Sequence, residues 1–329
     1  MNQQTHSALL VALALGTALT AGAAAGPAAA QTIQVTISHS QKTVDFLPLW
    51  IASDAGYFKK RGLDVTIRYL PAQEGVPAIL TGQVQMAGIG ASDAASAVAQ
   101  GAKLTLVATL TPIYTFQFWA RPDHATASTL KGQRVGITST TGSLYTGTVL
   151  ALKQLGLTTA DVVLTPLGGV VNVNNSLLAG SVVAAASHPP ATYRFKQAGL
   201  TELVDLPKSK IPSVSAGLWV TGAYIQAHRD VVQAIVDAVV EALHREKTDR
   251  AYAESEISAH LGVKDKTELD FTYDFYVNEI LADEPIPEAA EIQGDIDALA
   301  ASNPKVKTLD AATMLDQSFV KNATAANAK

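Results

Sequence analysis

The chain of 329 residues contains no cysteine. Without a thiol it cannot form a disulfide, bind a metal through thiolates, carry the lipid of a lipoprotein or use a cysteine nucleophile. A chain of this length does not depend on disulfides, because it can bury a large apolar core. The missing cysteines therefore exclude several classes of site without arguing against a stable fold.

The sequence also has fewer basic than acidic residues. The sequence has 24 Lys and Arg against 29 Asp and Glu, which gives a formal net charge of -5. A nucleic-acid partner would call for a basic face, so we expect no nucleic-acid binding. After residue 30 no apolar run is long enough to span a bilayer, so we expect no further membrane segment.

The first 30 residues carry no Lys, Arg, Asp or Glu. Residues 8–25 consist only of Ala, Leu, Val, Gly and Thr, and Ala28-Ala29-Ala30 has the small-x-small pattern of a signal-peptidase site. An uncleaved membrane anchor is the alternative, and the richness of this segment in Ala and Gly fits it less well. We predict a signal peptide at 1–30, cleaved near Ala30, and export to the periplasm. The remaining 299 residues (329 minus 30) suggest one large domain or two ordinary ones.

The stretch from Pro48 to Ile67 predicts a short helix, a turn and a strand. Pro48 suits the first helical turn, where its missing N–H would have no intrahelical partner. Gly56 and Gly62 can end helical segments. Leu63 to Ile67 then alternates apolar and polar residues, as a strand does. This arrangement is typical of a crossover in an α/β domain.

The same alternation of strands and helices occurs twice. The first block has predicted strands at 33–38, 63–68, 84–89 and 104–110, with helices between them. The second block has predicted strands at 116–120, 135–137, 162–165, 182–186 and 203–206, with a glycine-rich loop at 167–174. Such alternation predicts mostly parallel sheets, and the fresh start indicates a second lobe. After them we expect one strand at 217–221 returning to the first lobe, and then helices at 231–243, 253–261, 265–281, 288–300 and 310–320.

Four polar loops each follow a predicted strand and open a helix. They are rich in Ser, Thr and Gly and span 38–46, 90–93, 138–143 and 187–190. Ligands of open α/β sheets lie at the carboxyl ends of the strands, and helix N-termini there favour anions. The alternative for any single loop is that its hydroxyls only cap a helix. Four such loops together favour a binding site for an anionic ligand.

Catalytic patterns are weak. Gly142-Ser143 does not form the G-x-S-x-G elbow of a hydrolase, and Gly88-x-Gly90 lacks the third glycine of a dinucleotide fingerprint. No two histidines stand four residues apart to bind a metal. We therefore predict no catalytic residues, no metal and no cofactor. His39 and His188 fall in candidate loops, where each could contact a ligand or pack against its own neighbours.

Several short motifs occur in a family-like order. They are PLWIA at 48–52, GYFKK at 56–60, GLDV at 62–65, GQV at 82–84 and LKGQRVG at 130–136. With this order and spacing the chain resembles the periplasmic solute-binding proteins of nitrate/sulfonate/taurine ABC importers. Their superfamily also includes thiamine-precursor binders. The resemblance is clearest from residue 33 to about residue 220.

The resemblance implies an α/β type II periplasmic-binding fold, in which two lobes joined by two crossovers close on a ligand in a cleft. Lobe one would comprise 32–113 plus 218–329, and lobe two 114–217. The family's ligand-binding positions, carried over onto this sequence, are Phe46, Ser92, Tyr114, Ser139, Thr140, Gly142, Ser143 and His188.

The function that the resemblance implies is delivery of a small organic anion, such as a sulfonate or carboxylate, to an ABC importer. The protein would be a monomer that contacts the permease subunits in the membrane. A periplasmic sensor or chemoreceptor ligand-binding protein would use the same cleft. The superfamily also contains pyrimidine-synthesising enzymes, whose chemistry, as the resemblance implies it, uses iron and a Cys-rich motif that this chain lacks.

Overall fold

The computed structural model describes residues 32–327, with side chains to residue 325. The predicted signal peptide lies outside the described residues. Among residues 32–327, no helix combines the length and the apolar character needed to cross a membrane.

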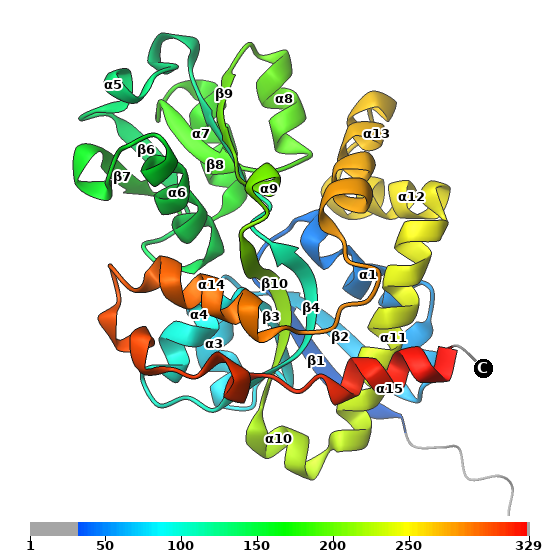
Figure 1. The fold of residues 1–329 in the computed structure, drawn as a ribbon. Helices are drawn as coiled ribbons and strands as arrows, with labels where there is room; N and C mark the ends of the chain where they lie inside the picture. The colour runs from blue at the N-terminus through cyan, green and yellow to red at the C-terminus, as the bar shows by residue number, and fades with distance from the viewer. Residues whose placement is uncertain (1–31, 328–329) are drawn as a thin grey trace, which may run out of the picture. The chain divides into compact units, whose positions relative to one another are not determined.

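The strands form two sheets of five strands each (Figure 1). The first sheet has the order β2-β1-β3-β10-β4. Its strands are β1 (Ile33–His39), β2 (Leu63–Tyr69), β3 (Met86–Ile89), β4 (Leu104–Ile113) and β10 (Pro212–Thr221). β1 pairs in parallel with β2 and β3, whereas β10 is antiparallel to β3 and β4. The returning strand predicted at 217–221 is therefore confirmed, and it lies between β3 and β4.

The second sheet repeats this plan in the order β7-β6-β8-β5-β9. Its strands are β5 (Gln117–Ala120), β6 (Arg134–Ile137), β7 (Val163–Pro166), β8 (Ala184–Ser187) and β9 (Thr201–Asp205). β6 is parallel to β7 and β8, and β5 is antiparallel to β8 and β9. Each sheet thus has four strands that run in one direction, with their carboxyl ends at one edge, and one antiparallel strand. This architecture confirms the predicted pair of α/β lobes.

Helices fill the connections and the C-terminal third of the chain (Figure 1). They are α1 (Leu47–Asp54), α2 (Tyr57–Lys60), α3 (Ala72–Leu80), α4 (Ala91–Val98), α5 (Ala127–Leu130), α6 (Gly142–Gln154), α7 (Val170–Ala179), α8 (Ala191–Gln197), α9 (Leu206–Ser209), α10 (Gly222–Ala227), α11 (Arg229–Thr248), α12 (Arg250–Leu261), α13 (Lys266–Phe275), α14 (Ala289–Leu299) and α15 (Ser318–Asn327).

Two predicted elements differ from the structure. The loop expected at 167–174 is helical from Val170 onward, because Gly169 is extended and Val170 and Val173 are buried. The single helix expected at 310–320 is a 3-10 turn, Ala311–Met314, followed by α15. The interruption has a local cause, since the Asp316 carboxylate accepts a hydrogen bond from the Ser318 backbone N–H and so begins a new helix there.

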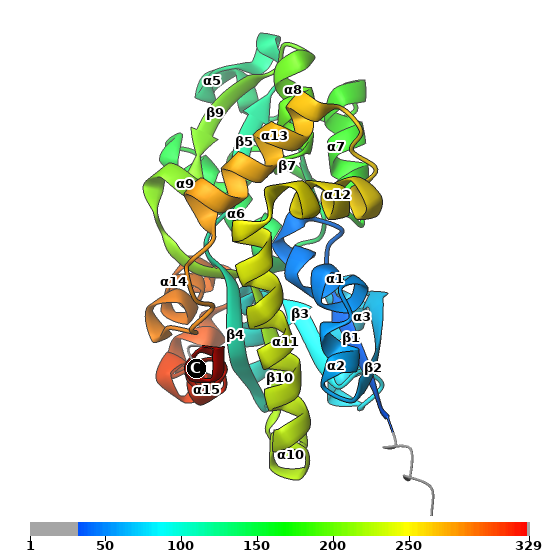
Figure 2. The ribbon, with the colours of Figure 1, turned by 90° about the vertical axis from the view of Figure 1, so that its right-hand side faces the viewer.

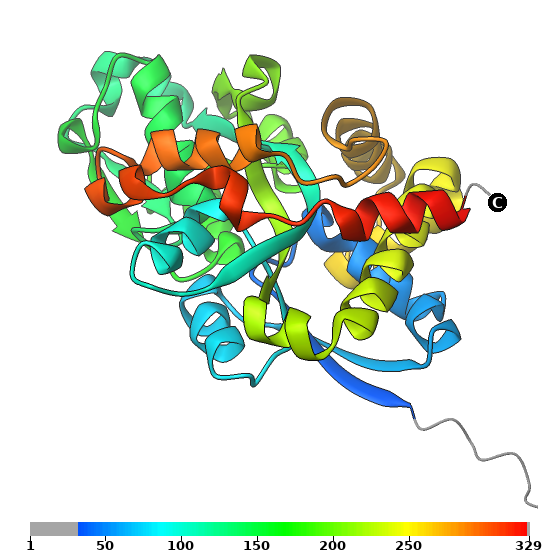
Figure 3. The same ribbon diagram turned by 60° about the horizontal axis from the view of Figure 1, so that its bottom comes forward.

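Both faces of the first sheet are covered by helices. Val35 and Ile37 pack with α1 and α11 on one face, while Ile89 and Trp219 pack with α4 and α14 on the other. α11 lies beside α1 (Figure 2), and the apolar stripe predicted for 231–243 is buried along it. α15 lies beside α11 (Figure 3), where the Gln233 amide donates to the Phe319 carbonyl at 2.8 Å. The first sheet is thus the centre of a continuous core.

Helix α13 reaches from the C-terminal part of the chain to the second sheet (Figure 2). Glu268 accepts a 2.6 Å hydrogen bond from Arg194 of α8, and the rings of Phe271 and Tyr193 lie 5.6 Å apart. β10 runs across the boundary that the sequence suggests between residues 217 and 218. The division into lobes at residues 113 and 217 stays a prediction.

Candidate ligand-binding site

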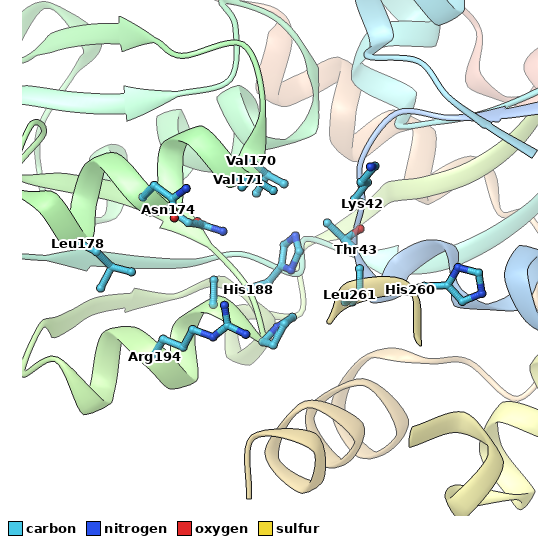
Figure 4. A pocket seen from close by; sticks show the side chains of 13 residues that line it. Lys42, Thr43, Val170, Val171, Asn174, Leu178, His188, Arg194, His260 and Leu261 are labelled. Carbon is cyan, nitrogen blue, oxygen red and sulfur yellow. The ribbon is translucent and has the colours of Figure 1, made fainter. Parts of the chain in front are cut away.

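A cavity of about 180 Å³ lies among loops and helices that follow strands of both sheets (Figure 4). The loop after β1 contributes Lys42 and Thr43, and the C-terminal end of α12 contributes His260 and Leu261. From the second block, α7 and the segment after β8 supply the opposite wall. The residues of that wall are Val170, Val171, Asn174, Asn175, Leu178, His188, Pro190, Ala191 and Arg194.

Two further hollows adjoin this cavity. One of about 270 Å³ shares Lys42, Val170 and Val171 with it. The other has a volume of about 30 Å³. It shares Tyr69 and Gly168 with the 270 Å³ hollow and extends to residues 138–144. Because neighbouring hollows have lining residues in common, we treat the three as one space and call it the cleft.

His188 forms the buried centre of the cleft, where it lies between Thr43 and the α7 side chains (Figure 4). Its Nδ1 is 3.1 Å from the Pro189 carbonyl oxygen and 3.1 Å from the Tyr276 hydroxyl. A carbonyl only accepts, so Nδ1 carries the proton. The Tyr276 hydroxyl donates its own proton to Asp45 Oδ2 at 3.0 Å. These contacts fix the orientation of the imidazole ring.

Several buried polar atoms around this centre have no hydrogen-bond partner within the described part of the chain. They are His188 Nε2, Thr43 Oγ1, Asp45 Oδ1 and Thr192 Oγ1. Buried polar groups in folded proteins are nearly always hydrogen-bonded, to the protein, to water or to a ligand. Thr43 and His188 both line the cavity, so two of these unpartnered atoms belong to residues that a molecule in the cavity would contact.

Two cationic side chains lie at the cleft, and they differ in how freely they can pair with a bound anion. Arg194 is paired with Glu268 at 2.6 Å, so part of its charge is already neutralised. Lys42 is exposed and forms no ion pair with any residue in the described range, and its Nζ lies 5.4 Å from the centre of the Tyr69 ring. Lys42 is therefore the better partner for an incoming anion.

Helix N-termini add to this positive character. α7 begins at the cavity with Val170, and its first turn has N–H groups without intrahelical acceptors. α6 begins at Gly142, whose φ of +86° favours glycine. The carboxylate of Asp93 lies against this start, because a Cβ at Gly142 would come within 2.9 Å of Asp93 Oδ2. Burial, together with the nearby Asp295, raises the pKa of Asp93 to about 7.

The predicted site residues divide into three groups. His188 lines the cavity, and Ser139, Gly142 and Ser143 line the small hollow. Thr140 is exposed on the same loop and lines none of the three hollows that make up the cleft. The ligand role of these five residues stays a prediction.

The other three predicted residues are buried and line none of the hollows. The Phe46 ring packs into the core over Gly88, at 5.7 Å from the His39 ring. Ser92 Oγ and the Tyr114 hydroxyl donate to Asp295 Oδ1 at 2.6 and 2.7 Å. Changing these side chains would therefore disturb packing as well as any ligand contact.

Sequence reasoning missed most of the cavity wall. Lys42 lies in a candidate loop but belongs to no recognisable motif. Nothing in the sequence distinguishes Arg194 from an arginine that is simply exposed to solvent. Val171 and Asn174 were missed because their segment was expected to be a loop, although the apolar residues Val170, Val173 and Leu177 have helical spacing. That spacing was the available signal.

Two lobes, each with a five-stranded sheet of the same order, and a cleft where their loops meet define a two-lobed periplasmic-binding fold. Solved structures share it. A protein from Bordetella bronchiseptica RB50 aligns with a TM-score of 0.79 and 20% identity, over 91% of this chain and 99% of that one. The alkanesulfonate-binding protein SsuA from Xanthomonas axonopodis pv. citri bound to MOPS aligns with a TM-score of 0.69 and 19% identity, over 88% and 97% of the two chains.

An enzyme has the same fold. The desulfurization enzyme DSZB aligns with a TM-score of 0.63 and 18% identity, over 90% of this chain and 99% of the enzyme. The family model described as NMT1/THI5 like matches residues 43–246, which is more than half of the chain. The chain therefore belongs to the NMT1/THI5-like family, and the resemblance found in its motifs is confirmed. No curated protein sequence matches the chain.

Proposed function

We propose that this protein is an extracytoplasmic solute-binding protein that delivers a small organic anion, a sulfonate or carboxylate or a related acid, to an ABC importer. It works in the periplasm after loss of its signal peptide, as a monomer that contacts the permease subunits. Family membership and the two-lobed fold support solute binding as the role. The fold neighbour SsuA is an alkanesulfonate-binding protein, which is consistent with an anionic ligand.

One observation carries the choice of an organic anion. The unpaired cation of Lys42 faces a wall that contains the unusually exposed apolar side chains of Val171 and Leu178, 54% and 37% exposed. Apolar side chains of this size gain free energy when a ligand covers them. A molecule with an acidic head and a short carbon skeleton would satisfy both features.

We further propose that the protein binds its ligand without changing it. The fold by itself does not separate binding from catalysis, since DSZB is an enzyme with the same architecture. A variant of that enzyme in which serine replaces a cysteine has been crystallised in complex with biphenyl-2-sulfinic acid, and this chain contains no cysteine at all. Incubation with candidate ligands should therefore return them chemically unchanged.

Ligand binding is tested by thermal shift and calorimetry with a panel of compounds. A ligand that binds only the native state raises the melting temperature, by an amount set by its concentration relative to Kd. We expect at least one alkyl or aryl sulfonate or carboxylate to raise it and to give a heat of binding at one molecule per chain. If only cationic or neutral compounds in the panel bind, the proposed ligand class is wrong.

Replacing Lys42 by glutamine removes the positive charge of the proposed anion partner and keeps a polar side chain of similar size. We expect the Kd for the best anion to rise about tenfold or more, since a charge-assisted hydrogen bond contributes roughly 1.5–3 kcal/mol. Lys59→Gln is the matched control, because Lys59 is also exposed but lies on α2 away from the cleft. Equal affinities of the two variants would argue against Lys42 as the anion partner.

Uptake measurements distinguish import from sensing. Cells that lack the protein should lose uptake of the labelled ligand and regain it on complementation. Normal uptake with a lost behavioural or transcriptional response would instead favour a sensor that uses the same cleft.

A further inference from the structure

We propose that Asp54, Glu256 and His260 form a binding site for one divalent transition-metal ion such as Zn²⁺. Asp54 is the last residue of α1, and the other two lie one turn apart on α12. One ligand atom from each residue lies within 4.8 Å of the others. The site borders the cleft through His260 but does not depend on the function proposed for the cleft.

The two distances from the His260 nitrogen to the carboxylate oxygens suit a metal. Bonds of about 2.0–2.1 Å in a tetrahedral arrangement place neighbouring ligand atoms roughly 3.3 Å apart. His260 Nε2 is 3.4 Å from Glu256 Oε2 and 2.8 Å from Asp54 Oδ2. A bound ion would leave the first distance unchanged and would lengthen the second by about half an ångström, which the exposed end of α1 can supply.

A buried carboxylate oxygen points to the same conclusion. Only 8% of the surface of Glu256 is exposed, and among residues 32–327 its Oε2 has no hydrogen-bond partner, although His260 Nε2, which is charged when protonated, lies 3.4 Å from it. A buried carboxylate oxygen without a hydrogen bond costs free energy, and a cation directed at it removes that cost. Oε2 faces the His260 nitrogen, so an ion held by that nitrogen and Asp54 would also contact it.

The imidazole ring of His260 is held in one orientation by packing. It stacks on the Trp50 ring at 4.7 Å between ring centres and 9° between planes. A hollow of about 250 Å³, lined by His39, Trp50, Ser53, Asp54, Ile67 and His260, opens beside it. Solvent in this hollow can supply the fourth ligand that a site with three protein ligands requires.

Calorimetry with Zn²⁺ alone tests the site. We expect one ion per chain and a raised melting temperature, because the ion would join α1 to α12 in the native state only. Asp54→Asn and Glu256→Gln should each weaken binding at least tenfold. His244→Gln should not change it, because His244 is exposed on α11 and is not part of the cluster.

Melting temperatures measured in EDTA show whether each variant is folded. If Glu256→Gln proves unfolded, Asp54→Asn decides, since Asp54 is exposed at a helix end. The proposal is overturned if the wild type binds no Zn²⁺, if Asp54→Asn binds it as tightly as the wild type, or if His244→Gln abolishes binding. None of these outcomes depends on which anion occupies the cleft.

Discussion

Replacing Gly294 by alanine is expected to destabilise the protein by about 3 kcal/mol, as overpacking in a core does. Gly294 lies in the middle of α14, where helix propensity alone would make alanine better by about 1 kcal/mol. A Cβ at this position would come 2.0 Å from the Pro212 carbonyl oxygen in β10. That atom is backbone, so either the strand or the helix must move. Chemical denaturation of both proteins measures the difference.

Gly222→Ala provides the control. Gly222 begins α10, and a Cβ there would meet nothing within 4 Å. We expect this change to leave stability the same or slightly raised. The two substitutions therefore have opposite expected signs although both place alanine in a helix. If Gly294→Ala is as stable as Gly222→Ala, helix propensity outweighs the close approach and the packing of α14 on β10 is looser than described.

The elements that the sequence predicted well are those with local signals. All ten strands were expected, because each combines β-branched or apolar residues with a bounding glycine or polar turn. The unit from Pro48 to Ile67 is an example, with Gly56 and Gly62 at positive φ where the helices α1 and α2 meet their turns. The predicted boundaries near residues 170 and 310 were wrong, because a buried valine decides the first and a capping aspartate decides the second.

The candidate site was harder to predict, because its residues meet through the fold. His188 was placed in the cleft by its loop, but its partners Asp45 and Tyr276 are distant in the chain. Ser92 and Tyr114 were predicted as ligand contacts from the resemblance to the family, and nothing local indicated that Asp295 would accept their hydrogen bonds. A single sequence carries no signal for a contact between residues about 200 positions apart, as Ser92 and Asp295 are.

Replacing Asp295 by alanine is expected to cost even more stability than replacing Gly294. Its Oδ1 accepts from Ser92 and Tyr114, and its Oδ2 accepts from Ser213 Oγ at 3.0 Å and the Val214 N–H at 2.9 Å. Asp295→Ala would leave these buried donors without an acceptor, at a cost of about 1–3 kcal/mol each before relaxation. We expect a net loss of roughly 4 kcal/mol in the free energy of unfolding. Full stability of this variant would mean that the four donors find other acceptors.

The dependence of stability on pH distinguishes the effect of the charge of Asp295 from the effect of its size and shape. Burial raises the pKa of Asp295 to about 6, above its ordinary value of 3.8. The native state therefore binds a proton more tightly than the unfolded state, so this group's contribution is present below about pH 4 and is lost as pH rises to about 6. Burial raises the pKa of Glu291 and Asp93 to about 7, which acts in the same direction, whereas burial lowers the pKa of His39, which acts against it.

Asp295→Asn removes the titration of this group, since asparagine keeps the size of the side chain and does not titrate. We expect the variant to be less stable than the wild type at pH 5, and the difference between the two to shrink as the pH rises to 8. Denaturation at several pH values measures that difference. The contribution of His39 largely cancels in it, whereas the charge of Asp295 helps to raise the pKa of Glu291 and Asp93, so its removal lowers both and changes the difference in the same direction. A difference that stays constant with pH would mean that the carboxyl of Asp295 is ionised throughout this range, with its four donors outweighing its burial.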